Sequence, residues 1–218
     1  MQAFARSFRS MLLSHIGVAV ASALLLSLML SSLYWRMCHD AVLTAYPSML
    51  IVKYGILPYR DLFVFNMVGT YGLYCLMGAT LGFSDLAFRF TDIALLSLVL
   101  LFTYQAQKRY GMKSAVMGAV LFGILYLCDG PKTSMQREFL ILLPLSASLW
   151  IVHSRRSGWA SFLLGVCCGI AASIKPHAVL LWVPVGIYQM TRERHGWRHA
   201  GLLVLGSTLP VAGVILML

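Results

Sequence analysis

The stretch that decides the fold reads Phe65-Asn-Met-Val-Gly-Thr-Tyr-Gly-Leu-Tyr-Cys-Leu-Met-Gly-Ala-Thr-Leu-Gly82. It is apolar enough to suggest a membrane span, yet it contains four glycines, two tyrosines and one asparagine. Tyrosine favours the level of the lipid headgroups. The composition is therefore typical of a helix that lies at the membrane interface. We predict that residues 64–83 rest along the membrane surface and do not cross it.

The chain around this stretch has the composition of a membrane protein. Of its 218 residues, 60% are hydrophobic and 11% are charged, whereas soluble domains carry about 25% charged residues. The net charge of +10 does not indicate nucleic-acid binding, because the basic residues sit in short loops between apolar runs. We predict an all-α membrane protein without a nucleic-acid partner.

Eight segments are apolar enough to consider as membrane helices: 11–35, 64–83, 89–106, 115–128, 138–152, 160–174, 177–190 and 199–218. Several of them are shorter than the roughly 20 residues that a helix needs to cross the hydrocarbon core. Their helices must therefore extend into the flanking residues, or the bilayer must thin around them.

The charges between these segments predict the orientation. Four short segments are basic: the N-terminus with Arg6 and Arg9, and residues 107–113, 153–156 and 191–198. If all eight apolar segments cross, three of the basic segments fall outside. If 64–83 does not cross, all four fall inside, as the positive-inside rule requires. We therefore predict about seven transmembrane helices in the cell inner (plasma) membrane, with the N-terminus cytoplasmic.

In this topology the extracytoplasmic side carries a long first loop at 36–88, a second loop at 129–137 and a turn at Lys175-Pro-His177. Six of the seven acidic residues then lie on or near that side: Asp40, Asp61, Asp85, Asp92, Asp129 and Glu138. Charge at the membrane face is costly and marks a functional site by default. We treat 1–218 as a single transmembrane module, either compact or part of a longer protein.

Asp40 is the first candidate for chemistry. It directly follows the first apolar run, and Gly55 and Pro58 should stop a short helix that begins near it. A carboxylate at the water boundary can act as a general base on a hydroxyl. The alternative is a helix N-cap or a solvated loop residue. Further along, Arg89 and Asp92 are three residues apart, which favours a structural ion pair on one helix face.

Several short motifs occur in a characteristic order: Gly55-x-x-Pro-Tyr-Arg-Asp61, Gly69-Thr-Tyr71, Leu81-Gly-Phe-Ser-Asp-Leu-Ala-Phe-Arg89, Gln136-Arg-Glu138 and Gly169-Ile-Ala-Ala-Ser-Ile-Lys-Pro176. With Asp40 they resemble the GT-C superfamily of membrane glycosyltransferases. The likeness is to the branch with protein O-mannosyltransferases and lipid A aminoarabinose transferases, and it covers about 36–190. It implies a GT-C-like module with juxtamembrane helices in the first outer loop.

The resemblance also implies a reaction. A sugar would pass from a polyprenyl-phosphate carrier to a lipid, glycan or protein acceptor on the outer face, with Asp40 as the catalytic residue. Glu138 or Asp129 would help to hold a divalent metal, Mg or Mn. The chain departs from the family where His39-Asp40 replaces a pair of acids, and where Phe65-Asn-Met-Val68 replaces His or Lys with Pro-Pro.

The leaving group of such a reaction is an anionic lipid phosphate, which Arg or Lys can neutralise. Arg60, Arg137 and Lys175 are the predicted phosphate-binding residues. Alternatively, Arg60 forms an exposed pair with Asp61, and the other two reach toward the lipid headgroups. Two other functions stay open: a non-catalytic membrane subunit or scaffold on the same fold, and a small transporter. The chain has few of the polar midplane groups that a transporter needs.

Overall fold

The computed structural model describes residues 2–154, 157–192 and 196–216, and these residues form helices joined by short loops. The α-helices are α1 (Gln2–Ser32), α2 (His39–Tyr54), α3 (Val68–Thr80), α4 (Asp85–Gln107), α5 (Met112–Cys128), α6 (Arg137–Leu140), α7 (Leu142–Ser154), α8 (Gly158–Ile174), α9 (Trp182–Arg192) and α10 (Gly196–Leu216). Two 3-10 helices, η1 (Lys108–Tyr110) and η2 (Pro176–Leu181), lie between them. In this part of the chain the extended pairing consists of one bridge between Pro58 and Leu62. The prediction of an all-α protein is confirmed.

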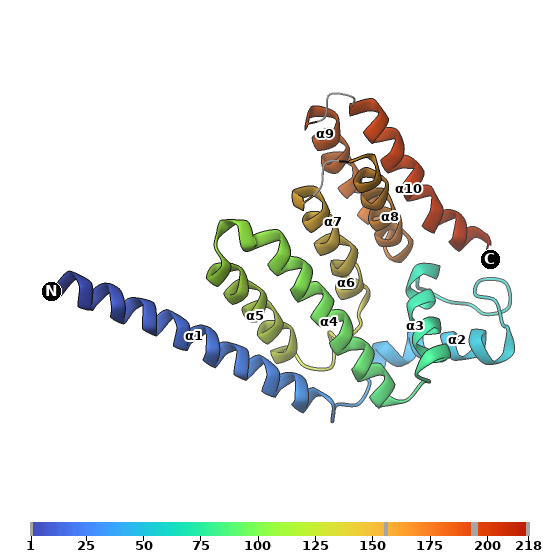
Figure 1. Ribbon diagram of the computed structural model, residues 1–218. Coiled ribbons are helices and arrows are strands. Elements are labelled where there is room, and N and C mark those ends of the chain that lie inside the picture. The colour runs from blue at the N-terminus through green and yellow to red at the C-terminus, as the bar shows by residue number, and fades with distance from the viewer. Residues whose placement is uncertain (1, 155–156, 193–195, 217–218) are drawn as a thin grey trace.

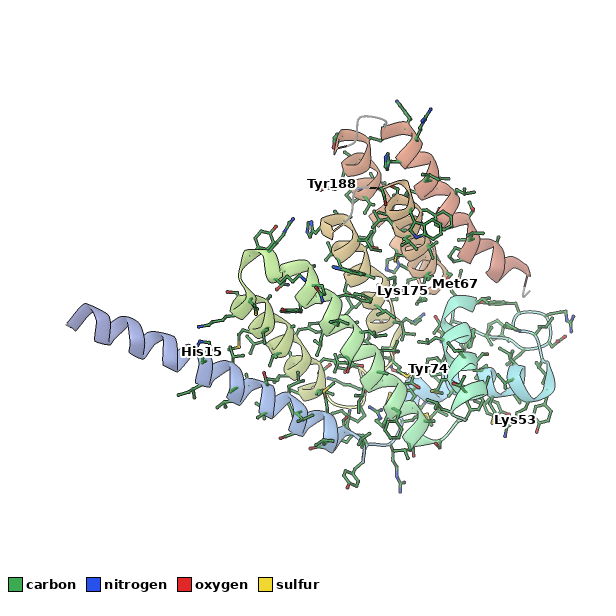
Figure 2. All side chains as sticks on the ribbon, in the orientation of Figure 1. His15, Lys53, Met67, Tyr74, Lys175 and Tyr188 are labelled. Carbon is green, nitrogen blue, oxygen red and sulfur yellow. The ribbon has the colours of Figure 1, made fainter. Side chains whose placement is uncertain are left out.

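The longer helices lie side by side, and each packs on the next (Figure 1). α1 packs on α5, α5 on α4, α4 on α7, α7 on α8, and α8 on α10. α2 and α3 pack on each other beside one set of ends of these helices, close to where α4 begins; we call this side the α2–α3 end. Lys175, Met67 and Tyr74 lie at this end, whereas Tyr188 of α9 lies at the other (Figure 2).

The acidic and basic segments separate between the two ends. α4 begins at the α2–α3 end with Asp85, and it ends at the opposite end, where η1 carries Lys108 and Arg109. The C-terminal ends of α7 and α9 also lie at the opposite end. Parts of their basic segments, 155–156 and 193–195, lie outside the described residues.

Within the described residues, two helices are long and apolar enough to cross a membrane: His15–Ser32 and Asp85–Tyr110, each with a mean hydropathy of 1.8. Shorter apolar helices span Met112–Cys128, Gly158–Ile174 and Pro176–Tyr188. α3 has 13 residues, so its length is about 20 Å, less than the hydrocarbon core of about 30 Å. The short length of α3 thus agrees with the composition of 64–83, whose glycines, tyrosines and asparagine make it a poor candidate for a membrane-spanning helix.

Proline and glycine explain where helices begin and end. Gly55 has φ 65° and donates its N–H to the Ile51 carbonyl, which closes α2 as predicted. Pro144 lacks an N–H, and its ring would collide with the Leu140 carbonyl of a continuous helix. The helix is therefore broken into α6 and α7 at Ile141.

α8 and α10 approach each other more closely than side chains would allow. A Cβ atom on Gly165 would lie 2.0 Å from the Leu203 carbonyl oxygen, and one on Gly206 would lie 2.1 Å from the Phe162 carbonyl oxygen. Glycine at these positions lets two backbones touch, which is a common packing mode of membrane helices. The close packing of α8 fixes the position of its C-terminal end, next to α3.

The α2–α3 end is held by the larger hydrophobic cluster of the molecule. Tyr74 of α3, Phe88 and Leu96 of α4, Leu127 of α5 and Phe139 of α6 are buried in it. α3 also touches α8, because a Cβ on Gly69 would lie 2.7 Å from the Ser173 backbone. These contacts bring α2, α3, α6 and the end of α8 together around the candidate site.

Candidate functional site

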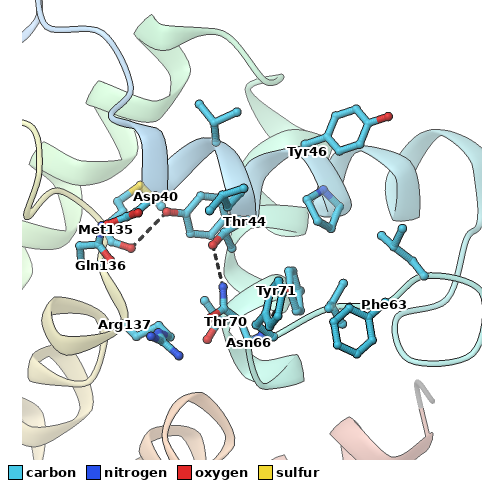
Figure 3. Close-up of a pocket in the computed structure, with 17 residues that line it drawn as sticks. Asp40, Thr44, Tyr46, Phe63, Asn66, Thr70, Tyr71, Met135, Gln136 and Arg137 are labelled. Atoms are coloured by element: carbon cyan, nitrogen blue, oxygen red, sulfur yellow. Dashed lines mark hydrogen bonds between the residues drawn. The ribbon is translucent and has the colours of Figure 1, made fainter.

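Two cavities meet at Asp40, Gln136 and Arg137, which line both of them. The first has a volume of about 560 Å³ and lies between α2, the loop before α3, and α3 (Figure 3). We call it the α2–α3 cavity. The second has a volume of about 1050 Å³ and lies between α5 and α6–α7. We call it the α5–α7 cavity. Sizes of this order suit organic ligands.

Asp40 lies in the first turn of α2, and the N-cap of that helix is Cys38. The N-cap alternative for Asp40 is therefore wrong. Its side chain is 66% exposed. One carboxylate oxygen lies 3.3 Å from His39 Nδ1, and the other lies 3.5 Å from Gln136 Nε2. The helix dipole favours negative charge at this position, so Asp40 is an accessible and loosely held carboxylate.

Arg137 is the cation that faces both cavities. Its side chain forms no hydrogen bond or ion pair with the residues that the structure describes. The guanidinium is close enough to act on Tyr71: burial raises the pKa of the Tyr71 hydroxyl, and the charge of Arg137 opposes that rise. An unpaired arginine in a cavity is suited to binding an anion.

The other two predicted phosphate-binding cations already have carboxylate partners. Arg60 donates to both oxygens of Asp61 at 2.9 and 2.8 Å, which lowers the pKa of Asp61. This exposed pair lies outside both cavities. Lys175 is 18% exposed and donates to Glu138. Lys175 lies outside both cavities, and Glu138 lines the α5–α7 cavity.

The side chains predicted to hold a divalent metal are also paired with lysines. Asp129 lies 2.8 Å from Lys132, and Glu138 is bound by Lys175. Across the described ranges, no three His, Cys, Asp or Glu side chains lie close enough together to hold an ion. Mg and Mn prefer several oxygen ligands, carboxylates above all. The arrangement therefore does not fit the predicted metal site, and no metal enters the mechanism below.

A buried charge pair holds the loop that leads into the candidate site. Arg89 and Asp92 are 0% and 1% exposed and lie 3.4 Å apart, which confirms the predicted structural pair. Arg89 donates to Ser134 Oγ at 2.7 Å. Asp92 accepts from the Tyr126 hydroxyl at 2.6 Å and from the Met135 N–H at 3.2 Å. The pair thus holds the loop that precedes α6.

Met135 turns this loop toward Asp40. It has φ 52°, a left-handed conformation that costs a non-glycine residue about 1–2 kcal/mol. Asp92 accepts its N–H, and its carbonyl accepts the Tyr74 hydroxyl at 3.1 Å. Gln136 and Arg137 follow immediately and enter the cavities. No local sequence signal predicts this turn, because it depends on partners in α3 and α4.

A polar cluster that sequence reasoning missed shapes the α2–α3 cavity. Asn66 Nδ2 donates to Thr44 Oγ1 at 2.9 Å, and the Asn66 N–H donates to the Tyr71 hydroxyl at 3.3 Å. The Tyr59 hydroxyl donates to the Asn66 carbonyl. These bonds tie the loop before α3 to both α2 and α3. The Gly69-Thr-Tyr71 motif was the one available signal for this region.

The chain matches no known family model, no curated protein and no solved structure. The likeness of its short motifs to GT-C glycosyltransferases therefore stays a prediction. Asp40, Gln136 and Arg137, which line both cavities, are the residues from which a function can be inferred.

Proposed function

We propose that this chain is a GT-C-type membrane glycosyltransferase that moves a sugar from a polyprenyl-phosphate carrier to an acceptor hydroxyl on the extracytoplasmic face. One observation carries the proposal. An accessible carboxylate, Asp40, and an unpaired guanidinium, Arg137, line the same two cavities. A group that can take a proton and a group that can neutralise a phosphate are thus within reach of the same ligands.

The proposed topology has seven crossings: α1, α4, α5, α6–α7, α8, η2–α9 and α10. α2 and α3 lie at the outer interface, and the N-terminus is cytoplasmic. Two facts support it: α3, with 13 residues, is shorter than each of the seven proposed crossings, and the basic residues of η1 lie at the end opposite Asp40. An inner-membrane location follows, because a polyprenyl tail stays in the lipid.

In the proposed mechanism Asp40 removes the proton of the acceptor hydroxyl as its oxygen attacks the anomeric carbon. The bond between that carbon and the phosphate oxygen breaks, and its electron pair leaves with the polyprenyl phosphate. Arg137 stabilises the negative charge that develops on the leaving phosphate. Gln136 Nε2 lies 3.5 Å from Asp40 and is its neighbouring hydrogen-bond donor at the junction of the cavities.

The test is sugar transfer in membranes that contain a pool of polyprenyl-linked donors. General-base catalysis contributes about 10²- to 10⁴-fold, so Asp40→Asn should lower the transfer rate by at least about 10²-fold. Asp61→Asn, which changes an acid outside both cavities, is the matched control. Equal transfer by wild type and Asp40→Asn would remove Asp40 as the base.

The second candidate is a non-catalytic membrane subunit or scaffold. The pairing of Asp129 and Glu138 with lysines favours it. These two carboxylates are the metal ligands that the resemblance to GT-C glycosyltransferases implies, and both already have a lysine as partner. In the same assay, absence of transfer by wild-type protein that is inserted and folded would support this reading over the enzyme.

A further inference from the structure

We infer that the α2–α3 cavity is a phosphate-binding site and that Thr70, together with Tyr71 and Arg137, donates hydrogen bonds to the phosphate. The inference rests on the proposed function in one respect, the identity of the molecule that carries the phosphate. It assigns the phosphate to one of the two cavities and names two hydroxyl groups that bind it.

Thr70 carries a buried hydroxyl without a partner. Its residue is 1% exposed, it lines the α2–α3 cavity, and its Oγ1 has no hydrogen-bond partner in the described structure. Buried polar groups are almost always hydrogen-bonded. An exception that faces a cavity is explained when a ligand supplies the missing partner.

Thr70 lies in the first turn of α3, where the usual acceptor of a helical threonine hydroxyl belongs to the preceding loop. Threonines deeper in helices bond to the carbonyl four residues earlier, as Thr80 does to Leu76 and Thr91 does to Ala87. For Thr70 that carbonyl belongs to Asn66, which lies in the loop and accepts the Tyr59 hydroxyl. Among the described residues the Thr70 hydroxyl forms no bond to this carbonyl or to any other acceptor, so it is available to a molecule in the cavity.

Two more donors face the same cavity. The Tyr71 hydroxyl accepts from the Asn66 N–H, which leaves its own proton to donate. Burial raises the pKa of Tyr71, so the group stays protonated. Arg137 has no acidic partner among the described side chains. Figure 3 shows Arg137 on one side of the cavity and Thr70, Asn66 and Tyr71 on the other.

Thr70, Tyr71 and Arg137 can each donate a hydrogen bond into the cavity, and none of them has an acceptor there among the described residues. They therefore match a negatively charged ligand group that has several acceptor oxygens. A phosphate ester offers up to three such oxygens. Thr70 and Tyr71 also lie in the first turn of a 13-residue helix, whose dipole favours an anion there. The α5–α7 cavity is less suitable, because Asp129 and Glu138 line it in addition to Asp40.

The test measures ligand binding, not transfer. The full chain is purified in detergent, and dissociation constants are measured by calorimetry for geranyl monophosphate, geraniol and inorganic phosphate. Wild type should bind geranyl monophosphate and not geraniol. Thr70→Val should weaken that binding about tenfold, the effect of one hydrogen bond to a charged group. Thr70→Ser, which keeps the hydroxyl, should restore the affinity.

The valine variant is a clean probe because Thr70 Oγ1 has no partner among the residues that the structure describes. Removing it breaks no internal hydrogen bond, so the melting temperature without ligand should not fall. Thr80→Val is the matched control on the same helix, since Thr80 lies outside the α2–α3 cavity. It should bind geranyl monophosphate as wild type does.

The outcomes separate the inference from the proposed function. Equal binding of geranyl monophosphate and geraniol, or equal affinity of wild type and Thr70→Val, would overturn the inference. Tighter binding of geranyl monophosphate than of inorganic phosphate supports a lipid-borne phosphate. Equal affinity for geranyl monophosphate and inorganic phosphate supports a free phosphate as the ligand. That result counts against the polyprenyl carrier, but not against the phosphate-binding site. Normal phosphate binding without any sugar transfer would refute the proposed function and leave the site in place.

Discussion

The backbone N–H of Met135 lies 3.2 Å from Oδ1 of Asp92, so a loop residue in the left-handed conformation is fastened to a buried carboxylate. The same carboxylate accepts the Tyr126 hydroxyl and faces Arg89. A charge pair inside the protein is expensive to bury. Here it fixes the residues that lead directly into Gln136 and Arg137.

Breaking this pair on one side should strongly destabilise the protein. Asp92→Asn leaves the Arg89 charge buried and unpaired, and such changes cost about 3–5 kcal/mol of unfolding free energy. Reversible unfolding in detergent measures the loss. The double variant Arg89→Met/Asp92→Leu should recover only part of the stability, because it removes the unpaired charge but leaves the Tyr126 hydroxyl and the Met135 N–H without their acceptor.

The exposed pair of Arg60 and Asp61 is the control for this experiment. Arg60→Gln should leave the unfolding transition where it is, since surface ion pairs contribute little. A double variant at Arg89 and Asp92 that is as unstable as Asp92→Asn would contradict the argument from unpaired charge.

Glycine on α10 offers a matched pair of substitutions. Gly206→Ala places a Cβ against the Phe162 backbone, whereas Gly201→Ala meets no atom within 4 Å. In a helix, alanine is otherwise about 1 kcal/mol more favourable than glycine. Gly201→Ala should therefore be neutral or stabilising, and Gly206→Ala should destabilise by about 1–3 kcal/mol. Unfolding measured in one detergent compares the two directly; equal effects would show that α8 and α10 are not in backbone contact.

Removal of divalent metal should leave transfer unchanged. Lys132 and Lys175 occupy the carboxylates of Asp129 and Glu138, so neither is free to coordinate an ion. The measurement is the initial rate of transfer in membranes with and without EDTA. A rate that falls in EDTA and returns when Mg or Mn is added would show that these ion pairs open and that the predicted metal site exists.

The proposed topology can be tested with a native cysteine. Cys128 is exposed at the C-terminal end of α5, which we place on the outer side. In a variant whose other cysteines are replaced by serine, a maleimide that cannot cross membranes should label Cys128 in intact cells. With Cys128 also replaced, Lys108→Cys should be labelled only after the membrane is opened. Labelling of both sites from outside would contradict the orientation.

Much of the fold could be predicted because it depends on local composition. Gly82, with φ 88°, follows directly after the C-cap of α3, and Gly55 ends α2. The spacing of Arg89 and Asp92 predicts their pair, since residues three apart share a helix face. The arrangement of these helices around the site depends on contacts between distant segments, for which the sequence carries no comparable signal.

The site itself was predicted only in part. Asp40 and Arg137 were named, and they line the same cavities. Arg60 was named from its charge, but its nearest acid is the next residue along the chain, and the two pair outside both cavities. Thr70 could not be singled out, because whether its hydroxyl finds a partner depends on how the loop before α3 folds against the helix.

The backbone contact between α8 and α10 has a consequence for biosynthesis. α9 is translated between them, so for some time α8 presents Gly165 and Gly169 with no backbone to cover them. In the proposed topology, lipid tails would cover these glycines if α8 left the translocation channel alone, and they would have to be displaced when α10 arrives. The chain is therefore expected to release α8, α9 and α10 from the channel together, as one helical unit.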